Sequence, residues 1–259
     1  MNKNTKYFKI NNLNYTGIQY GFFSRLGGYS EKEYTSLNCN LNAGDQKEKV
    51  IKNIELSKRI LDLNHTKIKF LNQTHSTNVA FINNKNFDTN IYADGGITID
   101  KKICLAILTA DCAPIFLFDN KNYLICALHA GWKGCLDNII SKAVKKINKI
   151  IKLNNQIIAI IGPCLSHNNF EVNENFKKKF LKRNLEYEKF FYYDQYSKKI
   201  YFNMRSLIDF QLQEMAIYKI YHVNKDTYSQ DSLFFSHRRS TCSESLATGR
   251  MINIVAFKQ

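Results

Sequence analysis

Proline is nearly absent from this sequence, with two residues in 259, and tryptophan occurs once. No stretch rich in proline, glycine or serine separates one half of the chain from the other, and no motif recurs at the periods of solenoids or propellers. These absences exclude a flexible linker and a repeat architecture. Because 44% of the residues are hydrophobic, the chain can bury a sizeable core, and we predict a single domain over residues 1–259.

Long apolar runs are also missing. No segment approaches the about 20 apolar residues that span a bilayer, and the first residues lack the apolar stretch of a signal peptide. The cysteines number seven, an odd count, and are scattered through apolar runs instead of forming a disulfide framework. Reduced thiols are typical of the cytosol. We therefore expect a cytoplasmic protein without membrane association.

Acidic residues are outnumbered, 22 to 37, which gives a formal net charge of +15. Thirty of the cations are lysine, spread along the whole chain. A nucleic-acid surface instead gathers its cations on one face and often uses arginine to bind phosphate or guanine. We interpret the charge as a solvated basic surface and expect no nucleic-acid partner. The protein is expected to be a monomer or a small homo-oligomer.

Short apolar runs alternate with turns through the middle of the chain. In these runs both the odd and the even positions are apolar, which is typical of strands covered on two faces. The runs are 68–71, 79–82, 103–108, 115–118, 124–128, 157–161 and 252–257. A turn predicted at residues 119–122 pairs two of them antiparallel. Helices are predicted over 46–61, 173–182 and 204–215. The pattern favours an α/β fold of the α+β type, with a mixed central sheet flanked by helices.

A further amphipathic helix follows the segment His129-Ala-Gly. Its apolar residues recur at helical spacing up to Ile151, with lysines on the opposite face. The first turn of this helix lies beside His129. Its free backbone N–H groups and the positive end of its dipole could hold an anion there.

Three polar side chains stand where apolar runs end: His75, Cys112 and His129. Two imidazoles and one thiolate are three of the four ligands of a tetrahedral zinc ion, and a site with three protein ligands keeps one position open for water or substrate. The ends of three strands can meet at one edge of a sheet, where α/β proteins build their sites. The alternative from residue chemistry alone is an exposed histidine at a turn and a buried structural thiol.

The sequence motifs resemble those of the YfiH family, also called the multicopper polyphenol oxidase or laccase-domain family. The matching blocks cover nearly the whole chain and follow the family order. They are Phe23-Ser-Arg25-Leu-Gly-Gly28, Ser36-Leu-Asn38, Gln73-Thr-His75, Ala93-Asp94-Gly, Thr109-Ala-Asp-Cys112-Ala-Pro, His129-Ala-Gly-Trp-Lys-Gly134, Ile161-Gly-Pro-Cys164, Ser236-His-Arg-Arg239 and Thr248-Gly-Arg250. The pair Ala-Asp-Cys and His-Ala-Gly-Trp is highly specific.

The resemblance implies a zinc-dependent purine nucleoside phosphorylase. Such an enzyme converts adenosine, inosine, guanosine or methylthioadenosine with phosphate into the free base and ribose 1-phosphate, and also deaminates adenosine. It implies that His75, Cys112 and His129 hold the metal. The sequence departs from the family pattern at Ser76 and Ser166, where glycine is usual. It also has Lys133 where arginine is usual, which removes bidentate recognition of an anion.

Phosphate needs cations, and we assign it to Arg25, Lys133 and Arg239. Asp111 is expected to give structural support, because an extended segment would point it away from Cys112. Asp94 is either a turn former or a partner that orients a ligand histidine. For three further residues the sequence is less specific: Trp132 is expected to pack in the core, His237 to lie near the pocket or at the surface, and Arg250 to brace its loop or bind an anion.

Three alternative functions remain open on sequence. Cys112 as nucleophile and His129 as base would give a metal-free hydrolase or deamidase. An enzyme that edits cell-wall precursors is compatible with the same hydrolytic site. Copper-dependent polyphenol oxidation is suggested by the older family name, and copper exceeds zinc in the affinity order for such ligands. A lone three-ligand site lacks the additional histidine clusters of multicopper electron transfer.

Overall fold

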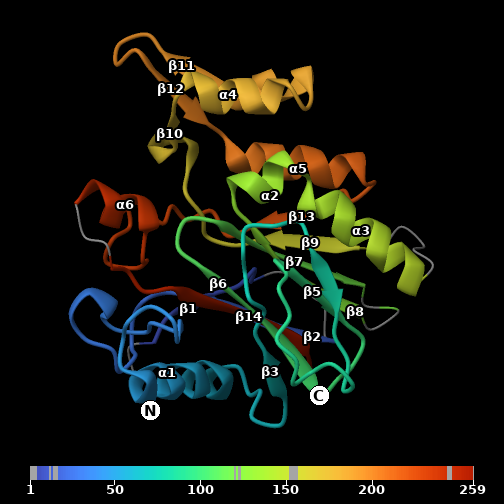
Figure 1. The fold of residues 1–259 in the computed structure, drawn as a ribbon. Helices are drawn as coiled ribbons and strands as arrows, with labels where there is room; N and C mark the ends of the chain where they lie inside the picture. Colours follow the sequence, from blue (N-terminus) through green and yellow to red (C-terminus); the bar gives the residue numbers. More distant parts are fainter. Residues whose placement is uncertain are drawn as a thin grey trace.

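The computed structural model describes residues 5–11, 13, 17–119, 121, 124–151, 157–243 and 247–258. Within these residues two mixed β-sheets lie against each other, and helices cover their outer faces (Figure 1). The predicted mixed α/β fold is confirmed. The strands divide between two facing sheets, where the sequence suggested one central sheet. No helix in the described part of the chain has the length and apolar character of a membrane span.

The first sheet has five described strands, in which β3 runs parallel to β6 and the other neighbours are antiparallel. Their order is β1 (Tyr7–Phe8), β2 (Ile18–Phe23), β14 (Met251–Phe257), β6 (Ile103–Thr109) and β3 (Lys67–Lys69). Helix α1 (Lys47–Ile60) covers the outer face of this sheet, where Val50 and Ile54 pack against Ile252 and Ile254. The short helix η1 (Lys32–Tyr34) precedes α1.

The second sheet has six described strands, with parallel pairs at both edges and antiparallel pairs between them. Their order is β13 (Lys219–His222), β9 (Ile158–Ile161), β7 (Ala113–Asp119), β8 (Leu124–Ala130), β5 (Gly95–Thr98) and β4 (Val79–Phe81). The antiparallel pairing of β7 with β8 is confirmed, although part of the predicted turn, Asn120 and Asn122, lies outside the described residues.

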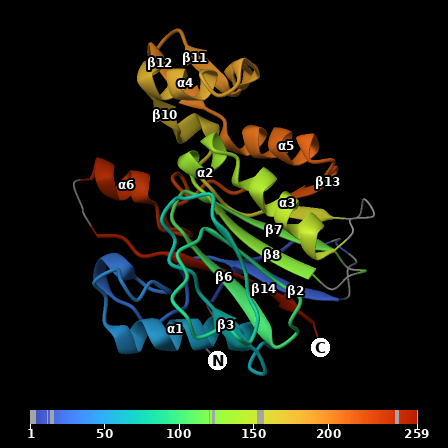
Figure 2. The same ribbon diagram turned by 45° about the vertical axis from the view of Figure 1, so that its right-hand side comes forward.

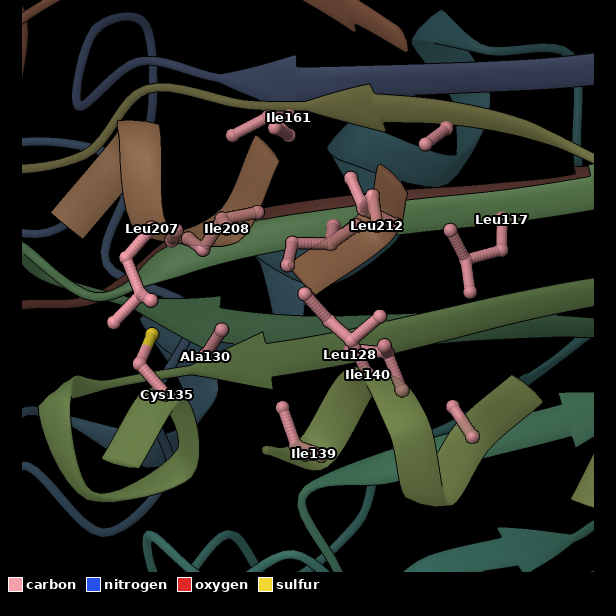
Figure 3. Packing of buried hydrophobic residues seen from close by; sticks show 14 of the residues in the cluster. Leu117, Leu128, Ala130, Cys135, Ile139, Ile140, Ile161, Leu207, Ile208 and Leu212 are labelled. Atoms are coloured by element: carbon pink, nitrogen blue, oxygen red, sulfur yellow. The ribbon is translucent and has the colours of Figure 1, made fainter. Parts of the chain in front are cut away.

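Three helices cover the outer face of the second sheet: α2 (Trp132–Leu136), α3 (Ile139–Ile150) and α5 (Met204–Glu214) (Figure 2). In this layer Leu207, Ile208 and Leu212 of α5 lie over the strands that carry Leu117 and Leu128 (Figure 3). The predicted helices over 46–61, 173–182 and 204–215 are confirmed to within one residue at each end by α1, α4 (Glu174–Leu181) and α5.

The space between the two sheets is filled by aromatic and branched side chains. Phe22 of β2 stacks on Phe116 of β7, with ring centroids 4.6 Å apart and an angle of 15° between the planes. Every residue of β7, β8 and β14 is buried. Burial on both faces explains why the apolar runs show no alternation with polar residues.

A small outlying layer extends beyond α2 and α5, at the top of Figure 1. It contains a three-stranded antiparallel sheet, a helix and two short helical turns: β10 (Glu171–Val172), β12 (Lys199–Phe202), β11 (Phe191–Asp194), α4 (Glu174–Leu181), η2 (His167–Asn169) and η3 (Leu185–Phe190). Phe180 and Phe202 pack at its centre, with ring centroids 4.8 Å apart. The short helix α6 (His237–Cys242) precedes the last strand.

The single amphipathic helix predicted after His129 is interrupted. Helix α2 ends at Leu136 and α3 begins at Ile139, because Asn138 adopts a left-handed conformation with φ of 56°. Asparagine tolerates this region better than most residues, and its side chain accepts a hydrogen bond from Ser141 N at 2.9 Å. The hydrophobic spacing continues across the break, so periodicity did not reveal it.

We expect Asn138→Ala to lower the free energy of unfolding by about 1–2 kcal/mol, because it removes the helix cap and places a Cβ in a left-handed conformation. Asn138→Gly is the matched control. Glycine loses the cap but tolerates the conformation, so it should cost only a few tenths of a kcal/mol. Urea denaturation measures both variants. Equal losses would show that the conformation at Asn138 contributes nothing.

Candidate metal centre

The three predicted ligands come together at one end of the strands of the second sheet, where β7 begins and β8 ends. His75 lies in the loop between β3 and β4, Cys112 lies between β6 and β7, and His129 lies near the end of β8. Their donor atoms are all within 4.8 Å of one another. Cys112 Sγ is 3.7 Å from His75 Nε2, and the two imidazole rings meet nearly edge to face with centroids 4.8 Å apart. The structure therefore brings together the three side chains that the sequence predicted to share a site.

The backbone around these ligands is unusual. His75 has φ of 58°, and Asp111, which precedes Cys112, has φ of 82°. Residues other than glycine hold such conformations only where their surroundings fix them, and these outliers cluster at functional sites. Gly131 lies against His75 and Cys112. A Cβ at this position would lie 2.9 Å from Cys112 Sγ and 2.9 Å from His75 Cδ2, so a larger residue would displace these two side chains.

Asp94 is fully buried and holds both histidines in place. Its Oδ1 lies 2.8 Å from His129 Nδ1 and accepts the backbone N–H of His75 at 3.0 Å, while Oδ2 accepts the N–H of Ser76 at 2.6 Å. Burial opposes ionisation, but hydrogen bonds from His129 and Ser76 hold the pKa of Asp94 well below its usual value. Of the two roles considered for Asp94, orientation of a ligand histidine is the one observed.

Ser76, one of the departures from the family pattern, takes part in the same network. Its hydroxyl donates to Asp94 Oδ2 at 2.7 Å and accepts the backbone N–H of Asn78 at 3.2 Å. A glycine at this position would lack the hydroxyl hydrogen bond. The serine therefore adds a second, side-chain contact that helps to fix the loop carrying His75.

The donor set fits a tetrahedral zinc centre with three protein ligands. In a tetrahedral ion with Zn–S of about 2.3 Å and Zn–N of about 2.1 Å, neighbouring donors are separated by roughly 3.5 Å. The measured 3.7 Å between Cys112 Sγ and His75 Nε2 matches this spacing. Because Nδ1 of His129 faces Asp94, Nε2 is the atom left to bind a metal, an arrangement common in zinc sites.

Without a metal ion, Cys112 and His129 favour their charged forms. Burial alone raises the pKa of Cys112, but His129 and His75 outweigh it and lower that pKa to about 6. Burial lowers the pKa of His129, but the Cys112 thiolate and Asp94 raise it to about 9. The pair therefore exists as thiolate and imidazolium between these two pH values.

The three ligands open onto a cavity of about 670 Å³, within the usual range for small-molecule sites. No aspartate or glutamate is among the described residues that line it. Besides these three residues, the wall is formed by two segments and six separate residues: Cys39–Asn42, Phe70–Thr74, Ile54, Tyr92, Leu108, Ala110, His237 and Arg250. The wall thus combines amide, aromatic and cationic groups next to the metal ligands.

The structural role predicted for Asp111 is observed. Its carboxylate accepts hydrogen bonds from the hydroxyls of Thr227 at 2.6 Å and Ser236 at 2.9 Å, and from the backbone N–H of Arg238 at 2.6 Å. Asp111 therefore fastens the segment before and within α6 to the Cys112 loop, and this fixes the position of His237.

The three residues assigned to phosphate lie elsewhere. Arg25 donates to the carbonyl of Thr35 at 2.6 Å, and Arg239 donates to the carbonyls of Thr227, Tyr228 and Phe234. Lys133 is exposed on α2 and lies over the ring of its neighbour Trp132. None of them is among the described residues that line the cavity.

His237 and Arg250 do line this cavity, although the sequence left the role of both undecided. The available signal was that Arg250 is one of seven arginines in a lysine-rich chain. Asn40, Asn42 and Tyr92 carried no recognisable signal, because they stand in turn-rich segments without a motif. Trp132 packs against Phe176 with centroids 5.2 Å apart, which confirms its predicted packing role.

Comparison with known proteins gives consistent matches along the chain. Residues 19–258 match the family model described as multi-copper polyphenol oxidoreductase laccase. A purine nucleoside phosphorylase of Rickettsia prowazekii is 30% identical over 232 residues, which cover 88% of this chain and 91% of the relative. Purine nucleoside phosphorylase YlmD of Bacillus subtilis is 30% identical over 263 residues, which cover 96% of this chain and 91% of the relative.

Solved structures agree with these matches. The Neisseria meningitidis protein NMB0706 superposes with a TM-score of 0.84 at 26% identity, over 99% of this chain and all of that one. The hypothetical protein YfiH of Bacillus licheniformis superposes with a TM-score of 0.84 at 28% identity, over 93% of each chain. The two-sheet arrangement described above is therefore shared with proteins of the same group.

Proposed function

Because the chain belongs to the multi-copper polyphenol oxidoreductase laccase family, as its YfiH-like motifs indicated, we propose that it is a zinc-dependent purine nucleoside phosphorylase. Its substrates would be adenosine, inosine, guanosine or methylthioadenosine together with phosphate, and its products the free base and ribose 1-phosphate. The observation that carries the proposal is the convergence of His75, Cys112 and His129 on a cavity large enough for a nucleoside.

In phosphorolysis, a phosphate oxygen forms a bond to C1′ of the ribose while the bond from C1′ to the purine nitrogen breaks. The purine leaves with the bonding electron pair and gains a proton. The enzyme must therefore place an anion beside C1′ and stabilise negative charge on the base. Bound at His75, Cys112 and His129, zinc would supply a Lewis acid with one open coordination position.

The chain's own residues would orient the reactants. Asp94 holds the proton of His129 at Nδ1 and so keeps Nε2 directed at the site. Asn40, Asn42 and Asn72 bring amide groups to the cavity wall, which can hydrogen-bond to the edge of a purine, and Tyr92 offers an aromatic face. A base held there would lie next to the metal ligands.

The same centre supports deamination of adenosine as an accompanying activity. There, water attacks the purine carbon that bears the amine, and the C–N bond breaks to release ammonia. An open coordination position beside the substrate is the feature that this reaction requires. Its products, inosine and ammonia, differ from those of phosphorolysis, so one assay separates the two activities.

The test is to measure the metal content of the purified protein and to incubate it with adenosine, with and without phosphate. Adenine, inosine, hypoxanthine and ribose 1-phosphate are followed by chromatography. We expect about one zinc per chain, and adenine release that requires phosphate and stops on chelation. Base release that ignores phosphate would indicate a hydrolase instead.

A metal-free cysteine hydrolase is the second candidate, and the charge state of Cys112 and His129 favours it. A thiolate beside an imidazolium is the reactive form of a catalytic cysteine. Chelation of the metal distinguishes the two candidates. A cysteine hydrolase keeps its activity on chelation and loses it on alkylation, whereas the zinc enzyme loses its activity on chelation.

In the metal-free protein, we expect iodoacetamide to react with Cys112 with a midpoint near pH 6, because the thiolate is the nucleophile and the thiol forms as the pH falls below that value. Mass spectrometry of the modified peptide gives the rate at each pH. Cys112→Ser is the control and should lack this reaction at low pH. A midpoint near the usual thiol value of about 8.5 would contradict the charge pairing.

A further inference from the structure

The cavity beside the metal ligands has a cationic wall with no acidic counterpart. Among the described residues that line it, Arg250 and His237 are the basic side chains other than the ligands, and none is aspartate or glutamate. An anion that enters this cavity therefore meets fixed N–H donors and no repelling carboxylate at its wall. The reaction proposed above needs such a place for phosphate, so the inference rests on that proposed function.

Arg250 is held by its backbone and keeps part of its guanidinium unused. Its N–H donates to Asn38 Oδ1 at 3.0 Å, and its carbonyl accepts the N–H of Cys39 at 3.1 Å. Nη1 donates to the carbonyls of Thr248 at 3.0 Å and Gly249 at 3.1 Å. Within the described part of the chain, Nε and Nη2 have no hydrogen-bond partner. These two nitrogens form the edge that binds an oxyanion bidentately.

The guanidinium is close to the centre of the site. Burial lowers the pKa of Arg250, while the negative charges of Cys112 and Asp111 raise it. A partly desolvated guanidinium with unpaired N–H groups gains more from an anionic ligand than a solvated one does. Arg250 is therefore close enough to Cys112 to feel its charge, and both residues line the same cavity.

His237 is placed on the same wall by Asp111. The carboxylate of Asp111 binds the flanking residues of His237, Ser236 through its hydroxyl and Arg238 through its backbone N–H. Asp111 is also the neighbour of Cys112 in sequence, so one side chain fixes His237 relative to the metal ligands. An imidazole N–H can add one hydrogen bond to an oxyanion held by Arg250.

From this geometry we infer that Arg250 and His237 form the phosphate subsite of the cavity. Arg250 binds two phosphate oxygens through Nε and Nη2, and His237 donates to a third. Phosphate held there lies in the same cavity as the open side of the metal centre, where the ribose of a bound nucleoside must present C1′. This subsite replaces the assignment of phosphate to Arg25, Lys133 and Arg239.

The test measures phosphate binding apart from catalysis. Equilibrium dialysis of the zinc-loaded protein with radiolabelled inorganic phosphate gives the Kd, and base release from adenosine gives the KM for each substrate. We expect Arg250→Met to weaken phosphate binding roughly 10- to 100-fold and to raise the phosphate KM in parallel. The KM for adenosine should change less than about threefold, because only the phosphate contact is removed.

Further variants complete the design. Arg183→Met is the matched control, since Arg183 is exposed and paired with Asp137 at 2.6 Å, and should leave both constants unchanged. Arg250→Lys should recover part of the binding, because it restores the charge without the bidentate edge. If Arg250→Met fails to fold, His237→Gln still tests the subsite and should weaken phosphate binding by roughly three- to tenfold.

The outcomes separate the two proposals. Phosphate binding that depends on Arg250 in a protein that releases no base would support the subsite and remove the proposed phosphorolysis. Unchanged phosphate affinity in both Arg250→Met and His237→Gln would overturn the subsite. Loss of phosphate binding in Lys133→Met, with normal binding in Arg250→Met, would also overturn the subsite. It would restore the assignment of phosphate to Lys133.

Discussion

Cys112→Ser is expected to reduce phosphate-dependent base release at least about 1,000-fold and to leave the purified protein with little zinc. A serine hydroxyl stays protonated near neutral pH and is a poor ligand, so the site would keep only the two imidazoles. The several kcal/mol that a bound metal contributes to a transition state correspond to a factor of this size. Metal analysis and the kcat for adenosine measure the two effects.

Cys242→Ser is the control for the loss of a thiol, because Cys242 is exposed at the end of α6. It should keep its zinc and its activity. Full zinc content together with lost activity in Cys112→Ser would favour a nucleophilic cysteine over a ligand. Retention of both would show that the His75, Cys112 and His129 group is not the active centre.

The cluster of His75, Cys112 and His129 and the positions of the strands were predictable because each depends on short-range information. A thiol or imidazole at the end of an apolar run is visible in the sequence, and residues 124–128 are apolar throughout because the strand is buried on both sides. The division of the strands between two sheets was not predictable. An apolar run shows that both faces are covered, but not whether a helix or another sheet covers them.

The residues around the ligands were harder to assign, since their roles depend on backbone conformation and on partners far apart in sequence. Arg25 and Arg239 resemble anion ligands in sequence, but in each of them two guanidinium nitrogens donate to backbone carbonyls. Arg250 lines the cavity directly before β14, which enters the first sheet between β2 and β6. Sequence spacing carries no information on which guanidinium is left with unused donors.

Asp94 shows how one buried carboxylate can join two ligands that the sequence keeps apart. It accepts the backbone N–H of His75, which stands 19 residues before it, and lies against Nδ1 of His129, 35 residues after it. The strand β5 begins at the next residue, Gly95, and pairs with β8. The register of this pair therefore sets the distance between Asp94 and His129. The geometry of the site therefore depends on a residue that is not itself one of the three clustered side chains and does not line the cavity.

Asp94→Asn is accordingly expected to lower zinc affinity about 100-fold and the free energy of unfolding by about 3 kcal/mol. The amide brings an N–H₂ group to an oxygen position that now accepts only N–H and O–H donors, so it leaves His129 or Ser76 without an acceptor. A competing chromophoric chelator measures the affinity, and urea denaturation measures the stability.

Asp100→Asn is the matched control. Asp100 stands in the turn between β5 and β6 and accepts the N–H of Lys102 at 2.8 Å, a contact that asparagine can keep. Its zinc affinity should equal that of the unmodified protein. If Asp94→Asn lost stability but bound zinc with unchanged affinity, Asp94 would support the fold alone and His129 would need no partner to present Nε2. Loss of affinity larger than the loss of stability is the result that marks Asp94 as the residue positioning both histidines.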